Sequence, residues 1–80
     1  MKYNFIVFGS QTTAIKVMKN IMNNYQIKSE IIQTPKAIKL RSCSYCLKLN
    51  DEYTESVLKY LKSSNIYFLG VYDSNYEKIN

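Results

Sequence analysis

Two cysteines, Cys43 and Cys46, have the most evident covalent or metal-binding chemistry in this chain, which contains no histidine. They form a C-x-x-C motif, and no acidic side chain lies between Glu30 and Asp51. The basic residues around them are Lys36, Lys39, Arg41 and Lys48. Positive charge favours the thiolate over the thiol. We therefore expect the local field to lower the pKa of Cys43 and to make it a nucleophile.

The C-x-x-C motif has other interpretations. In thioredoxin-like proteins it opens a helix, whereas here it precedes a predicted strand over Tyr45–Leu49. As a zinc site it supplies two of the usual four ligands, so only a dimer pooling two pairs could complete one, and we expect no metal. A Cys43–Cys46 disulfide would require the strand to begin late, because alternate residues point to opposite faces. Cys46 is favoured as a small buried hydrophobic residue, and Cys43 as the functional thiol.

Apolar patterning predicts the elements that position these cysteines. Short β-branched and aromatic runs indicate strands, and apolar residues spaced three and four apart indicate two helices. The expected strands are 3–8, 27–33, 45–49 and 66–72, and the expected helices are 11–24 and 50–64. Ser10 is expected to cap the first helix, and Pro35 to end the second strand and shape the loop that follows.

This β-α-β, loop, β-α-β order predicts an α+β, ferredoxin-like two-layer sandwich. Its four-stranded, mostly antiparallel sheet would carry two helices on one face, with the first and third strands central. Residues 1–72 would form the single domain and residues 73–80 a frayed polar tail. The second sheet face would then be bare unless a partner covered it, which favours a homodimer.

Composition narrows the class of protein. The net charge of +5 comes almost entirely from lysines spread along the chain, with Arg41 the single arginine. A lysine-, asparagine-, isoleucine- and tyrosine-rich chain is typical of an A- and T-rich coding bias, so we do not favour nucleic acid as a partner. No apolar run is long enough to span a membrane or serve as a signal peptide, and we expect a cytoplasmic protein with reduced cysteines.

Several of these residues also carry a resemblance to a known family. The matching positions are Phe8, Ser10, Ala14, Thr34, Pro35, Ile38, Ser42, Cys43, Leu47 and Gly70-Val71-Tyr72. From Tyr3 to Tyr72 the chain resembles the selenium/sulfur carrier-like family, a small domain of unknown function. That family's central pattern is Thr-Pro-Arg-Glu-Ile-Ser-Ser-Ser-Cys-Gly, with its cysteine at Cys43. This chain departs at Lys36, Ala37 and Ser44, and the last replaces a glycine suited to a turn.

The resemblance implies a carrier that holds sulfur or selenium on Cys43 as a persulfide or selenopersulfide. A donor such as a cysteine desulfurase would load the thiol, and an acceptor protein or thiol would take the atom. Lys39 and Arg41 would stabilise the anionic forms, and Cys46 could act as a resolving thiol. Supporting positions would be Ser42, Ser44, Pro35 and Ser10. No separate cofactor is implied.

Two other functions stay open. One is a non-catalytic ferredoxin-like module for protein interaction or dimerisation, with structural cysteines. The other is a small-anion or nucleic-acid binder, whose binding would depend steeply on salt. A self-contained enzyme is not favoured, because no histidine, placed carboxylate pair or phosphate-binding glycine loop is present.

Overall fold

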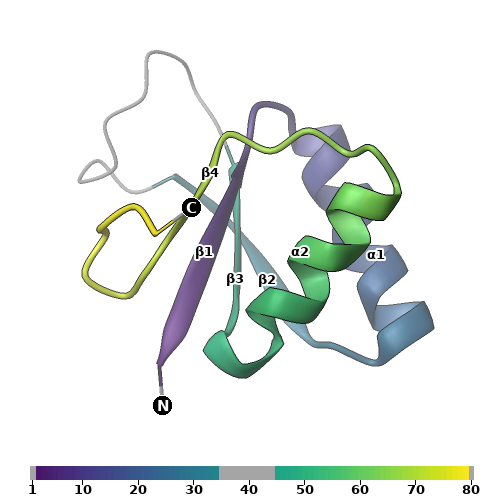
Figure 1. The fold of residues 1–80 in the computed structure, drawn as a ribbon. Helices are drawn as coiled ribbons and strands as arrows, with labels where there is room; N and C mark the ends of the chain where they lie inside the picture. The colour runs from purple at the N-terminus through teal and green to yellow at the C-terminus, as the bar shows by residue number, and fades with distance from the viewer. Residues whose placement is uncertain (1, 35–44, 80) are drawn as a thin grey trace.

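A computed structural model of the chain describes residues 2–34 and 45–79 (Figure 1). The elements follow the predicted order. They are β1 (Tyr3–Phe8), α1 (Gln11–Tyr25), β2 (Ser29–Gln33), β3 (Tyr45–Asn50), the 3-10 turn η1 (Asp51–Tyr53), α2 (Thr54–Ser63) and β4 (Gly70–Tyr72).

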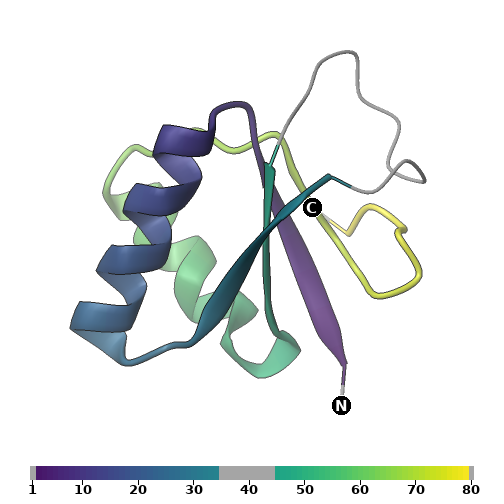
Figure 2. The ribbon, with the colours of Figure 1, turned by 180° about the vertical axis from the view of Figure 1, so that it is seen from behind.

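The four strands form one sheet in the order β2-β3-β1-β4, and every neighbouring pair is antiparallel. Both helices lie on the same side of this sheet in the two opposite views of Figures 1 and 2. The central position of β1 and β3 is the one that right-handed crossovers require. The predicted ferredoxin-like α+β fold is therefore confirmed.

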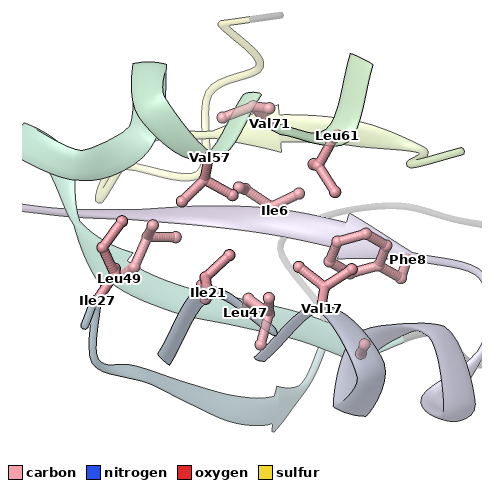
Figure 3. Close-up of a cluster of buried hydrophobic side chains, with 11 residues drawn as sticks. Ile6, Phe8, Val17, Ile21, Ile27, Leu47, Leu49, Val57, Leu61 and Val71 are labelled. Atoms are coloured by element: carbon pink, nitrogen blue, oxygen red, sulfur yellow. The ribbon is translucent and has the colours of Figure 1, made fainter. Parts of the chain in front are cut away.

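The main core lies between the helices and the sheet (Figure 3). Ile6 and Phe8 of β1 point toward the helices, as alternation along a strand dictates. Apolar residues spaced three and four apart form one face of α1 and a shorter face of α2. These faces pack onto the β1 side chains and are buried. The buried helix residues are Ala14, Val17 and Ile21 in α1, with Thr54, Val57 and Leu61 in α2.

Helix α1 has a defined cap at each end. Ser10 is extended (φ −143°), and its hydroxyl accepts a hydrogen bond of 3.3 Å from the Thr13 N–H. At the other end Gln26 is left-handed (φ 56°), and its N–H donates to the Met22 carbonyl at 3.1 Å. The Ile27 N–H then donates to Ile21, also at 3.1 Å. These bonds satisfy the last helical carbonyls, and β2 consequently begins at residue 29 rather than 27.

The last strand is shorter than predicted, running over Gly70–Tyr72 instead of 66–72. It pairs with Phe5–Val7 of β1, and the Leu69 N–H still reaches the Val7 carbonyl at 2.7 Å. Upstream of Leu69, β1 has already turned toward α1 and offers no further backbone partner. Tyr67 is accordingly 78% exposed. The aromatic run around it does not form a strand, because it has no neighbouring strand to pair with.

The prediction of a bare second sheet face is wrong. Phe5, Val7 and Cys46 form a small buried cluster on the side away from the helices. The ring of Tyr76 stacks on Phe5 with 5.5 Å between ring centroids. Part of this face is thus covered by the chain itself, and the argument for a dimer formed through it is lost.

The C-terminal segment is a folded turn rather than a frayed tail. The Asp73 carboxylate accepts hydrogen bonds from the N–H groups of Asn75 and Glu77, at 2.9 and 3.0 Å. The segment then returns to β4, where Lys78 forms an isolated antiparallel β-bridge with Tyr72. Figures 1 and 2 both show the turn on the side of the sheet opposite the helices.

We predict that Thr54→Val destabilises the protein by about 1–3 kcal/mol, because it removes the partner of a buried amide. Asn4 of β1 donates to the Thr54 hydroxyl at 2.9 Å, and both side chains are buried. Chemical denaturation measures the loss. Thr12→Val, an exposed threonine-to-valine change in α1, is the matched control. Wild-type stability in Thr54→Val would contradict the role given to this bond.

Candidate functional site

The register of the sheet places both ends of the loop between β2 and β3. Gln33, the last residue of β2, pairs with Tyr45, the first residue of β3. Tyr45 also pairs with Phe8, the last residue of β1. The loop therefore leaves and rejoins the sheet beside the end of β1, where the chain turns into α1. The end of the first strand was expected to lie near this loop.

Most of the predicted site residues lie outside the described residues. These are Pro35, Lys39, Arg41, Ser42, Cys43 and Ser44. The structure places the other two, Cys46 and Ser10. Cys43 precedes the first residue of β3 by two positions in the sequence.

Cys46 lies in the sheet with no exposed surface. It is the second residue of β3 and pairs with Val7 of β1 on one side and Ile32 of β2 on the other. Its thiol donates a hydrogen bond to the Thr34 hydroxyl, with 3.3 Å between Sγ and Oγ1. A thiol in this position packs as a small apolar side chain with one polar contact.

The surroundings of Cys46 disfavour its thiolate. Burial raises the pKa of the Cys46 thiol above its ordinary value of 9.0, although the hydrogen bond with Thr34 acts in the opposite direction. Cys46 is therefore protonated at neutral pH. Since the Cys46 thiol is inert, any thiolate chemistry of this chain would come from its other cysteine, Cys43.

Ser10 acts as a helix cap, as its sequence position predicts. Its exposed side chain also lines a shallow pocket of about 340 Å³, together with Lys16 of α1 and Tyr67 of the segment before β4. This pocket opens at the same end of the sheet at which β1 finishes. Lys16 and Tyr67 give its rim a cation and an exposed aromatic ring.

Sequence reasoning missed Thr34 as the partner of Cys46. The available signal was its position two residues after Ile32, which puts both on the same face of the extended chain. Pro35 also favours an extended Thr34. The register between β2 and β3 was needed to place that face beside Cys46.

Residues 2–34 and 45–79 hold no group of three His, Cys, Asp or Glu side chains that could bind a metal ion. None of the helices in these ranges is long and apolar enough to cross a membrane.

The chain is a small ferredoxin-like domain with two cysteines. The Cys46 thiol is buried in the sheet, and Cys43 belongs to the segment that joins β2 to β3. Residues 2–73 match the family described as "Putative Se/S carrier protein-like". The chain belongs to this family, which confirms the resemblance seen in the sequence. No curated protein and no solved structure matches the chain.

We predict that the stability contributed by Cys46 is lost at high pH. Because folding raises its pKa, the contribution is complete below the unfolded pKa and disappears as pH rises through the folded pKa. The free energy of unfolding of the wild type minus that of Cys46→Ala should thus be constant at neutral pH and should shrink above pH 9.0. Denaturant titrations across this range measure it. A difference that does not change with pH would contradict the burial of a protonated thiol.

Proposed function

We propose that this protein is a carrier that holds a sulfane sulfur or selenium atom on the Cys43 thiol. The observation that carries the proposal is the burial of Cys46 in a chain with two cysteines. Membership of the carrier-like family supports it, because the matched range of residues 2–73 includes Cys43.

Loading is a nucleophilic displacement. The Cys43 thiolate attacks the outer sulfur of a persulfide, R–S–SH, supplied by a donor protein or a small molecule. A new S–S bond forms on Cys43, the donor's S–S bond breaks, and the donor leaves as a thiolate that takes up a proton. Selenium would follow the same course as a selenopersulfide. The chain need only supply a thiolate, and Lys39 and Arg41 are the cations that would stabilise it.

Delivery reverses this step. An acceptor thiolate attacks the outer sulfur of the Cys43 persulfide, takes that atom, and releases the Cys43 thiolate unchanged. This route needs no second cysteine in the carrier.

Release through Cys46 is a slower alternative. Its thiolate would attack the inner sulfur of the Cys43 persulfide, form a Cys43–Cys46 disulfide and expel hydrosulfide. In the resting structure Cys46 is buried and hydrogen-bonded to Thr34, so this attack requires local opening of β3 and loss of its proton. We therefore assign delivery to the acceptor thiol.

We predict that Cys43→Ser abolishes loading with sulfane sulfur, whereas Cys46→Ala loads as the wild type does. The proteins are incubated with polysulfide, or with a cysteine desulfurase and cysteine. Intact-mass spectrometry then counts added sulfur atoms, and cyanide treatment releases the outer sulfur as thiocyanate. Circular dichroism confirms that both variants are folded.

Cys46→Ala is the matched control, because it removes the other thiol of the same motif. Equal loading of Cys43→Ser and wild type would overturn the proposal. Absence of loading in all three proteins would favour the alternative function, a ferredoxin-like interaction module with structural cysteines.

A further inference from the structure

Acidic and basic side chains are distributed unequally between the two ends of the sheet. The loop end is the one at which Phe8 pairs with Tyr45, and the far end is the one at which Tyr3 pairs with Asn50. Helix α1 begins at the loop end, whereas α2 begins at the far end and finishes at the loop end (Figure 1).

The acidic side chains all belong to the half of the molecule toward the far end. The chain has six Asp and Glu residues, and the structure describes every one of them. Glu30 of β2 is level with Phe5 across the sheet. Asp73 and Glu77 follow Tyr72, which is also level with Phe5. The other three lie at the far end itself, in η1 and at the start of α2: Asp51, Glu52 and Glu55.

Basic side chains lie at the loop end without these acids. Lys16, in the second turn of α1, is exposed and lines the pocket of about 340 Å³ beside Ser10. Lys62 is exposed in the last turn of α2. The segment that joins β2 to β3 adds three more basic residues in sequence: Lys36, Lys39 and Arg41. The loop end is therefore the positive end of the molecule.

The pocket beside Ser10 also has an exposed aromatic ring on an anchored segment. Tyr67 is 78% exposed, whereas its neighbours Ile66 and Phe68 pack against the main core. The Ile66 N–H donates to the Leu61 carbonyl at 2.9 Å, which fixes the chain as it leaves α2. Tyrosines whose position is fixed in this way are typical anchors of protein interfaces, because little freedom is lost when a partner contacts them.

We propose that Lys16 and Tyr67 form a docking surface for the acceptor protein, and that the acceptor presents its thiol from an acidic surface. The proposal rests on the carrier function, since it gives the chemistry of the protein that takes the cargo. Cys43 precedes Tyr45 by two residues, and two residues of chain span at most about 7 Å. The covalent chain therefore keeps Cys43 near the end at which the acceptor docks.

The far end has a larger pocket, of about 590 Å³, but its charges do not favour an acidic partner. Glu30 lines this pocket together with Lys28 and Lys48, and the Lys48 ammonium already lies over the Tyr3 ring, 4.5 Å from its centroid. The six residues of β3 also separate it from Tyr45, by about 17 Å of strand. An acceptor docked there would be too far from the point at which the loop rejoins the sheet.

The test follows the reaction of the Cys43 thiolate with two synthetic peptides of equal length, each with one cysteine activated as a pyridyl disulfide. Aspartates flank the cysteine in one peptide, and lysines flank it in the other. The thiolate attacks the peptide sulfur, a Cys43–peptide disulfide forms, and pyridinethione leaves, so its absorbance gives the rate. An ionic strength of about 0.1 M gives a Debye length of about 10 Å, which restricts the effect to nearby charges.

The wild type is expected to react faster with the acidic peptide than with the basic one. Lys16→Glu should slow the acidic peptide at least about threefold and should not slow the basic one, because a nearby attractive charge becomes repulsive. Lys28→Glu is the matched control, since it makes the same change at an exposed position beyond the other end of α1. Tyr67→Ala should slow the acidic peptide by a similar factor, whereas Tyr53→Ala, at an exposed tyrosine of the far end, should not.

Equal rates for the two peptides in the wild type would overturn the proposal. So would equal slowing by Lys16→Glu and Lys28→Glu, or by Tyr67→Ala and Tyr53→Ala. A single-stranded RNA oligonucleotide that binds the wild type but not Lys16→Glu would also overturn it and would assign the surface to nucleic acid.

This assay and the loading assay can fail separately. The peptide reaction needs only the Cys43 thiolate, whereas loading with polysulfide tests whether the thiol holds a sulfur atom. Normal loading without a preference for the acidic peptide rejects the docking surface alone. A preference for the acidic peptide without loading rejects the carrier function.

Discussion

The pairing of β1 with β3 is the constraint on which the rest of the structure depends. It joins the two β-α-β halves over six residues of each strand, from Tyr3 opposite Asn50 to Phe8 opposite Tyr45. Its helix-facing residues form the sheet side of the core. Its last pair, Phe8 opposite Tyr45, fixes the position at which the loop rejoins the sheet. Because a shift by one residue would turn every side chain to the other face, this register also decides that Cys46 is buried.

The register fixes the environment of Cys46. Cys46 is held within the sheet, and its thiol donates a hydrogen bond to the Thr34 hydroxyl at the point where the loop leaves β2. Its thiol is thereby kept protonated and out of contact with solvent. A carrier gains from this arrangement, because a second reactive thiol three residues away would discharge the cargo as hydrosulfide before an acceptor arrived.

The fold could be predicted from the sequence because its signals are local: the stripe of Val17 and Ile21, the β-branched and aromatic run of β1, and the cap at Ser10. The features that were missed depend on long-range partners. The length of β4 follows from how much of β1 is free to pair, and the Thr34–Cys46 contact follows from the β2–β3 register. The C-terminal turn relies on Asp73 and on stacking of Tyr76 against Phe5, which no periodicity in a polar segment indicates.

The most direct measurement for the central claim is the pH dependence of alkylation at each cysteine in the native protein, resolved by peptide mass spectrometry. The account predicts that Cys43 reacts rapidly, with a pKa well below that of an ordinary cysteine thiol. Cys46 should react slowly at neutral pH and at a rate set by local opening of the sheet. Slow and equal reaction of both cysteines would contradict the account and would assign both thiols a structural role.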